Sequence, residues 1–126
     1  LTLYYFANKL NYLVVGSGNK SELMMGYFTK YGDGGVDILP LGGLLKSEIR
    51  ELGKILGIPE KIIKKVPTAG LWPGQTDEGE MGITYDEIDK VLSKNFSQIS
   101  KKAIKKVKER IALTEHKRKP PKIYEV

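Results

Sequence analysis

The sequence predicts an α/β fold with a parallel sheet, as one partial domain over residues 1–126 with a helical C-terminus. The first half alternates helix, strand, helix, short strand and helix, which is the pattern of parallel sheets. The run Tyr-Leu-Val-Val at residues 12–15 is apolar without alternation, as in strands buried on both faces. Because two strands alone do not form a stable sheet, we expect an N-terminal half to precede this sequence.

The composition narrows the class of protein. Hydrophobic residues make up 40% of the chain and charged residues 29%, which is typical of a soluble globular domain. No apolar run approaches the roughly 20 residues that cross a bilayer. The absence of cysteine excludes disulfide scaffolds and cysteine nucleophiles, and the single histidine excludes a multi-histidine metal site. No signal peptide opens the chain, so we expect a cytoplasmic protein that is not secreted.

Helical spacing of apolar residues begins at the first residue. A helix is expected over residues 1–10, ended by Asn11, with a face made of Leu3, Phe6, Ala7 and Leu10. The elements that follow are a strand, a glycine turn, a helix, a glycine loop and a short strand, expected at residues 12–15, 16–21, 22–28, 31–35 and 36–41.

The second half of the chain is predicted to be helical. Helices are expected at residues 46–56, 59–66 and 84–92, and from Ser97 to the prolines at 120–121. The core face of the first consists of Ile49, Leu52, Ile55 and Leu56. A capping box from Thr84 to Glu87 marks the start of the third. Residues 67–83 have no assignment, and a loop of this length is usually functional or mobile.

The glycine turn at residues 16–21 is the strongest local indication of chemistry. A helix N-terminus after glycines offers free backbone N–H groups to a phosphate, and Lys20 adds a full charge. Glu22 lies where a carboxylate could hold a phosphate-bound magnesium ion. The Walker A pattern is absent, and Ser21 stands where a dinucleotide fingerprint has its third glycine. A purely structural glycine turn is an equally good interpretation.

Charged residues mark two further places. Lys30, Asp33 and Asp37 surround the second glycine loop, where they suit a ribose or phosphate contact or simply form a solvated turn. Lys46 opens a helix against the helix dipole, so either an anion binds there or the lysine is an ordinary surface residue.

The C-terminal quarter of the chain is basic. Residues 94–126 contain 11 Lys and Arg residues against 3 Asp and Glu, whereas residues 1–93 contain 10 against 12. The run His116-Lys117-Arg118-Lys119 is the densest part. Such a segment suits an anionic ligand, a nucleic acid, a membrane surface or a solvated helix face.

Five blocks of sequence closely resemble the NAD synthetase family, in order and over nearly the whole chain. They lie at residues 16–22, 26–37, 67–71, 72–78 and 114–121. The resemblance implies a Rossmann-like parallel sheet with flanking helices, of the adenine nucleotide alpha hydrolase-like kind. It also implies an ATP-dependent ligase that adenylates deamido-NAD with Mg²⁺ and ATP, after which ammonia displaces AMP to give NAD. Family members form homodimers, and neither nucleic acid nor membrane is an expected partner.

The resemblance also implies roles for single residues, although it assigns no catalytic residue. The ATP contacts would be Ser17, Lys46 and Thr68. The magnesium ligand would be Glu22. The deamido-NAD contacts would be Lys30, Asp37, His116 and Lys117. The loop around Trp72 would act as a lid that keeps water from the acyl-adenylate.

Two features depart from the family pattern. Gly70 stands where an aspartate usually follows Pro-Thr-Ala. The family's Ser-Gly-Gly-x-Asp-Ser phosphate loop belongs N-terminal to everything in this sequence, so we expect the 126 residues alone to be inactive.

Two other functions compete with the ligase. One is a Rossmann-type nucleotide-binding module without ligase activity, for which Asp37 has a suitable distance from the glycine turn. The other is a nucleic-acid-binding module that uses residues 94–122, although no known motif accompanies the basic segment. The choice between ammonia and glutamine as nitrogen donor stays open, since an amidase domain would lie upstream.

Overall fold

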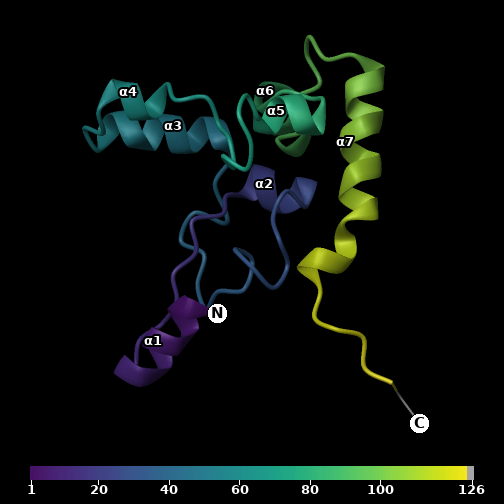
Figure 1. The fold of residues 1–126 in the computed structure, drawn as a ribbon. Helices are drawn as coiled ribbons and strands as arrows, with labels where there is room; N and C mark the ends of the chain where they lie inside the picture. Colours follow the sequence, from purple (N-terminus) through teal and green to yellow (C-terminus); the bar gives the residue numbers. More distant parts are fainter. Residues whose placement is uncertain (125–126) are drawn as a thin grey trace. The chain divides into compact units, whose positions relative to one another are not determined.

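The computed structural model describes residues 1–124 as helices joined by loops (Figure 1). The helices are α1 (Thr2–Leu10), α2 (Lys20–Met25), α3 (Lys46–Ile55), α4 (Glu60–Ile63), α5 (Asp77–Met81), α6 (Tyr85–Leu92), α7 (Lys101–Leu113) and the 3₁₀ helix η1 (Glu115–Arg118). The chain divides into two compact units. The first comprises residues 1–44 with the chain from residue 108 onward, and the second comprises residues 45–107. None of the helices within residues 1–124 is both long and apolar enough for a membrane span.

The predicted strands at residues 12–15 and 36–41 are not formed as strands, which corrects the expected sheet. Among the described residues they meet in a single parallel bridge between Val15 and Ile38. Gly16 N–H donates to the Ile38 carbonyl at 2.9 Å, and Asp37 N–H donates to the Val14 carbonyl at 2.9 Å. The parallel direction agrees with the prediction. The ladder stays short because no further strand in residues 1–124 extends it, and Val15 remains 59% exposed.

Helices α1 and α2 of the first unit follow local signals. Helix α1 ends at Asn11, as predicted, which adopts the left-handed conformation at φ 56°. On its expected apolar face Ala7 is buried, whereas Leu3, Phe6 and Leu10 are exposed. Helix α2 starts two residues before the prediction and ends at Gly26, whose φ is 62°.

The buried apolar residues of the second unit are Leu45, Met81, Ile83, Tyr85, Ile88, Val91, Ala103 and Val107. The predicted capping box at Thr84 is present, with Thr84 Oγ1 accepting from Glu87 N–H. The predicted core face of α3 is wrong at its C-terminal end, where Ile55 is 81% exposed. Helix α5, inside the unassigned segment, is capped by the Thr76 side chain and ended by Gly82 at φ 62°.

Helix α7 begins later than predicted. Gln98 has a φ of 58°, in the left-handed region, which a right-handed helix cannot include. The Ser100 hydroxyl instead accepts from Ala103 N–H at 3.1 Å, at the point where the helix starts. At its other end, α7 stops at Leu113 and η1 follows before the prolines.

Candidate functional site

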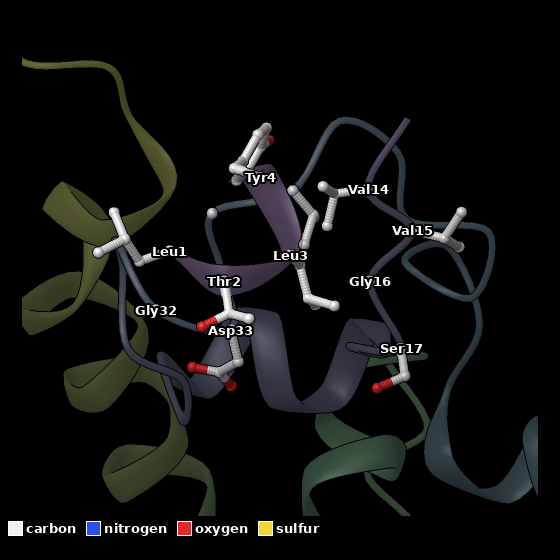
Figure 2. Close-up of a pocket in the computed structure, with 12 residues that line it drawn as sticks. Leu1, Thr2, Leu3, Tyr4, Val14, Val15, Gly16, Ser17, Gly32 and Asp33 are labelled. Atoms are coloured by element: carbon white, nitrogen blue, oxygen red, sulfur yellow. The ribbon is translucent and has the colours of Figure 1, made fainter. Parts of the chain in front are cut away.

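A pocket of about 340 Å³ lies in the first unit, beside the first glycine turn (Figure 2). Its walls come from the start of α1, from residues 14–17 and from the second glycine loop. The side chains of Thr2, Ser17 and Asp33 border it (Figure 2). The parallel bridge therefore brings both predicted glycine segments to one pocket, as expected for the ends of parallel strands.

The first glycine turn is shaped by packing. A Cβ atom added to Gly16 would lie 2.7 Å from a Leu39 methyl and 2.8 Å from a Val36 methyl. Two backbone donors at the start of α2 already have partners within the protein. Lys20 N–H donates to the Leu44 carbonyl, and Glu22 N–H donates to the buried Asn19 side chain. These contacts support the structural interpretation of this turn, while Ser17 stays exposed at the pocket rim.

Glu22 completes the capping box of α2. Its Oε2 accepts from Asn19 N–H at 3.1 Å. Within the described residues no three His, Cys, Asp or Glu side chains cluster in a way that could hold a metal ion. Mg²⁺ is usually held by one or two protein carboxylates together with substrate phosphates and water. The role of Glu22 as a magnesium ligand stays a prediction, with the rest of the ligands to come from phosphates and water.

Asp37 joins α1 to the parallel bridge. One carboxylate oxygen accepts from the Tyr4 hydroxyl at 3.1 Å, and the other accepts from Val14 N–H at 2.7 Å. Desolvation, the hydrogen bond to Asp37 and the charge of Asp37 together raise the pKa of Tyr4 above its usual value. Asp33 orders the neighbouring loop by accepting from Thr29 N–H at 2.7 Å.

The structure brings Lys30, His116 and Lys117 together. Lys30 Nζ donates to the carbonyls of His116 at 2.7 Å and Lys119 at 2.6 Å. In the opposite direction, Lys117 Nζ donates to the carbonyls of Gly26 at 2.8 Å and Phe28 at 2.7 Å. These reciprocal bonds fasten residues 26–30 to the C-terminal segment. The exposed His116 ring lies 3.1 Å from the Leu113 carbonyl through Nδ1.

Two arginines to which the sequence analysis gave no role of their own complete this arrangement. Arg118 Nη1 donates to the carbonyls of Leu23 at 3.1 Å and Met24 at 2.9 Å, and Arg110 Nε donates to that of Met25 at 3.1 Å. They satisfy carbonyls at the C-terminus of α2, where positive charge is favourable. The only sequence signal for them was the density of basic residues, which gives no partner.

In the second unit, Lys46 and Thr68 are the predicted site residues. Lys46 Nζ lies 4.9 Å from the centroid of the Tyr85 ring. The exposed Thr68 turns its hydroxyl oxygen to Gly70 N–H at 3.0 Å. At the start of α3, Ser47 N–H donates to the buried Asp89 carboxylate at 2.8 Å. The sequence suggested an anion at the start of α3, and the Asp89 carboxylate is one anion that lies there.

The parallel bridge, the glycine turn after it and the pocket beside both glycine segments are features of α/β nucleotide-binding domains. The family model of NAD synthase matches residues 1–121 of the chain. The chain therefore belongs to the NAD synthase family, and its fold is a fragment of that family's fold.

Two relatives whose names describe them as NAD(+) synthetases agree with the family assignment. The chain is 49% identical over 136 residues to the NH(3)-dependent NAD(+) synthetase of Sulfolobus acidocaldarius, covering 98% of this chain and 49% of that protein. It is 54% identical to the one of Carboxydothermus hydrogenoformans, covering 97% of this chain and 49% of that protein. The chain thus spans about half the length of these relatives.

Solved structures show the same fold. The NMN synthetase from Francisella tularensis superposes with a TM-score of 0.91 at 48% identity, over 99% of this chain and 52% of that one. The NH3-dependent NAD synthetase from Campylobacter jejuni, in complex with the nitrate ion, gives a TM-score of 0.74 at 33% identity, over 98% of this chain and 50% of that one.

Proposed function

We propose that this chain is the C-terminal part of an enzyme that amidates deamido-NAD with ammonia at the expense of ATP. The observation that carries the proposal is the family match over residues 1–121. ATP would activate the nicotinate carboxylate as an adenylate with release of pyrophosphate, and ammonia would then displace AMP. Because the chain spans about half of its relatives, the proposal includes an N-terminal half that supplies the phosphate loop.

The proposed roles of single residues follow the family pattern. ATP would meet Ser17, Lys46 and Thr68, Mg²⁺ would meet Glu22, and deamido-NAD would meet Lys30, Asp37, His116 and Lys117. Positive charge at Lys46 would offset the charge that develops on the phosphates. For Lys30 and Lys117, the bonds to backbone carbonyls support a role in ordering the loops around the substrate.

The loop at residues 67–76 would protect the adenylate from water. Its ends are held together by Asp77 N–H, which donates to the Pro67 carbonyl at 3.0 Å. Leu71 and Trp72 between them are 75% and 53% exposed, so the loop offers apolar side chains that could cover a bound substrate. We further infer from the resemblance a cytoplasmic homodimer.

The test uses the complete protein with deamido-NAD, Mg²⁺, ATP and ammonium chloride, with NAD and AMP quantified together. Equal yields of NAD and AMP are expected. AMP without NAD would show that an adenylate forms and is then hydrolysed, which would place the fault in the loop that contains Gly70. If neither NAD nor AMP is formed, a nucleotide-binding module without ligase activity becomes the better explanation.

A second candidate substrate follows from the Francisella tularensis structure, which is called an NMN synthetase and matches with a TM-score of 0.91. The same chemistry on the deamidated mononucleotide would give NMN. Offering both carboxylates at equal concentration and separating NAD from NMN would decide between the two. A product mixture dominated by NMN would replace deamido-NAD as the proposed substrate while leaving the ligase chemistry in place.

A further inference from the structure

Tyr85, at the first position of α6, is fixed by contacts on several sides. Its hydroxyl donates to Asp77 Oδ2 at 2.9 Å, and its backbone N–H donates to Glu78 Oε1 at 2.8 Å. The Lys46 ammonium lies over its ring at 4.9 Å from the centroid. The residue is 1% exposed, so the ring has a single position. One buried tyrosine thus contacts both the start of α3 and the segment that follows the long loop.

The side chain of Asp77 is a buried carboxylate, and its burial opposes folding. It is 6% exposed, and its Oδ1 has no hydrogen-bond partner among the described residues. Burying a carboxylate with one oxygen unsatisfied is unfavourable unless other interactions compensate. Its backbone N–H closes the base of the loop at Pro67, and its side chain holds the Tyr85 hydroxyl. The arrangement links the loop base to the aromatic ring.

We propose that Tyr85 is a positioning residue that holds the Lys46 ammonium in place for the phosphates of ATP. The inference rests on the proposed function for the role of Lys46. An ammonium over an aromatic face is attracted by the ring quadrupole and loses some of its side-chain freedom. Lys46 carries four rotatable bonds, so this contact restricts where the charge can lie before the nucleotide binds. Tyr85 itself touches no substrate in this proposal.

The kinetic test is a double-mutant cycle in the complete protein. Tyr85→Leu removes the ring and should raise the KM for ATP about three- to tenfold, with a smaller change in kcat and in the KM for the carboxylate substrate. Tyr85→Phe keeps the ring and should stay within about twofold of the parent. In a Lys46→Met background, Tyr85→Leu should add no further effect, because its partner is already gone. Effects that multiply in that background would overturn the proposal.

A second measurement does not depend on activity or on the stability of the leucine variant. The complete protein is labelled with ¹³C at Cε of its lysines and measured by NMR. The signal of the Lys46 methylene should be shifted upfield by the ring current of Tyr85. This signal is assigned by its disappearance in Lys46→Arg. The shift should persist in Tyr85→Phe. A Lys46 signal at the position of the exposed lysines in the parent protein would overturn the positioning role. If the shift is present but neither NAD nor NMN is made, the proposed function fails while the placement of Lys46 by Tyr85 stands.

Discussion

The Asp89 carboxylate on α6 accepts a 2.8 Å hydrogen bond from the backbone N–H of Ser47 in the first turn of α3. Asp89 is 5% exposed, so the bond forms out of water and between two elements far apart in the sequence. Negative charge at a helix N-terminus is favourable, and a buried N–H left without an acceptor is not. The pair therefore stabilises the junction of α3 and α6.

Replacing Asp89 tests this contact. Asp89→Ala should lower the free energy of unfolding by about 2–3 kcal/mol, because it leaves a buried donor unpaired. Asp89→Asn keeps an acceptor and should lose only about 1 kcal/mol from the missing charge. Urea denaturation of the complete protein measures both. Asp86→Asn on the same helix is the control, since the Asp86 side chain is 71% exposed and its pair with Lys90 should contribute less than about 0.5 kcal/mol. Equal losses in Asp89→Ala and Asp86→Asn would contradict the argument.

Replacing Arg118 even by lysine should destabilise the protein. Its guanidinium reaches two carbonyls of α2 and the Thr114 hydroxyl from one nitrogen, which a single ammonium cannot reproduce with the same geometry. Arg118→Lys should lower the free energy of unfolding by about 1–2 kcal/mol and speed amide hydrogen exchange in α2.

The neighbouring Lys119 provides the control for Arg118. Its ammonium pairs with Glu115 at 2.9 Å, and both side chains are more than half exposed. Lys119→Ala keeps the backbone carbonyl that Lys30 uses and should change stability by less than about 0.5 kcal/mol. If Arg118→Lys and Lys119→Ala gave the same small effect, the basic segment would be a solvated surface after all.

Alanine substitutions at three glycines distinguish a steric clash from backbone strain as the cause of lost stability. A Cβ atom at Gly26, where φ is 62°, would lie 2.6 Å from both Oγ1 and Cγ2 of Thr114. At Gly70, where φ is 67°, and at Gly43, it would meet nothing within 4 Å. Substitution by alanine should therefore lower the free energy of unfolding by about 3 kcal/mol or more at Gly26, by about 1 kcal/mol at Gly70, and hardly at Gly43. Thermal and urea unfolding of the three variants would rank them, and a large loss at Gly43 would contradict this order.

Local signals were readable from the sequence, and long-range partners were not. Asn11 ends α1 and Thr84 caps α6 as predicted, because each depends on neighbours within a few residues. The strands failed because a ladder needs further strands beside it, and Val15 and Ile38 offer only one bridge. The helix after Thr76 was overlooked because it is five residues long and contains Gly79.

The candidate site was predictable in its residue types but not in their contacts. The basic residues at 116–119 indicated an anion, whereas Lys117 and Arg118 bind backbone carbonyls more than 85 positions away in the sequence. A charged residue also gives no sign in the sequence of being buried, so Asp77 and Asp89 were not expected inside the second unit. Their partners, Tyr85 and Ser47, became visible only in the structure.

The Tyr4–Asp37 hydrogen bond should make the protein sensitive to alkaline pH. In the folded state the pKa of the Tyr4 hydroxyl is raised by desolvation, by the hydrogen bond to Asp37 and by the Asp37 charge. The folded state thus holds the phenolic proton more tightly, and this contribution to stability is complete below the unfolded pKa of about 10. It is lost as the pH rises through the higher folded-state pKa. The stability difference between the parent and Tyr4→Phe should therefore shrink in that alkaline range.

Ultraviolet absorbance gives the direct measurement of this effect. The titration of Tyr4, obtained by subtracting the Tyr4→Phe curve from that of the complete parent protein, should have its midpoint above the usual value for tyrosine. Asp37→Asn removes the negative charge and should move that midpoint down. The same variant should weaken the parallel bridge, because Val14 N–H loses a charged acceptor at 2.7 Å. A midpoint that Asp37→Asn leaves unchanged would show that the carboxylate does not act on Tyr4.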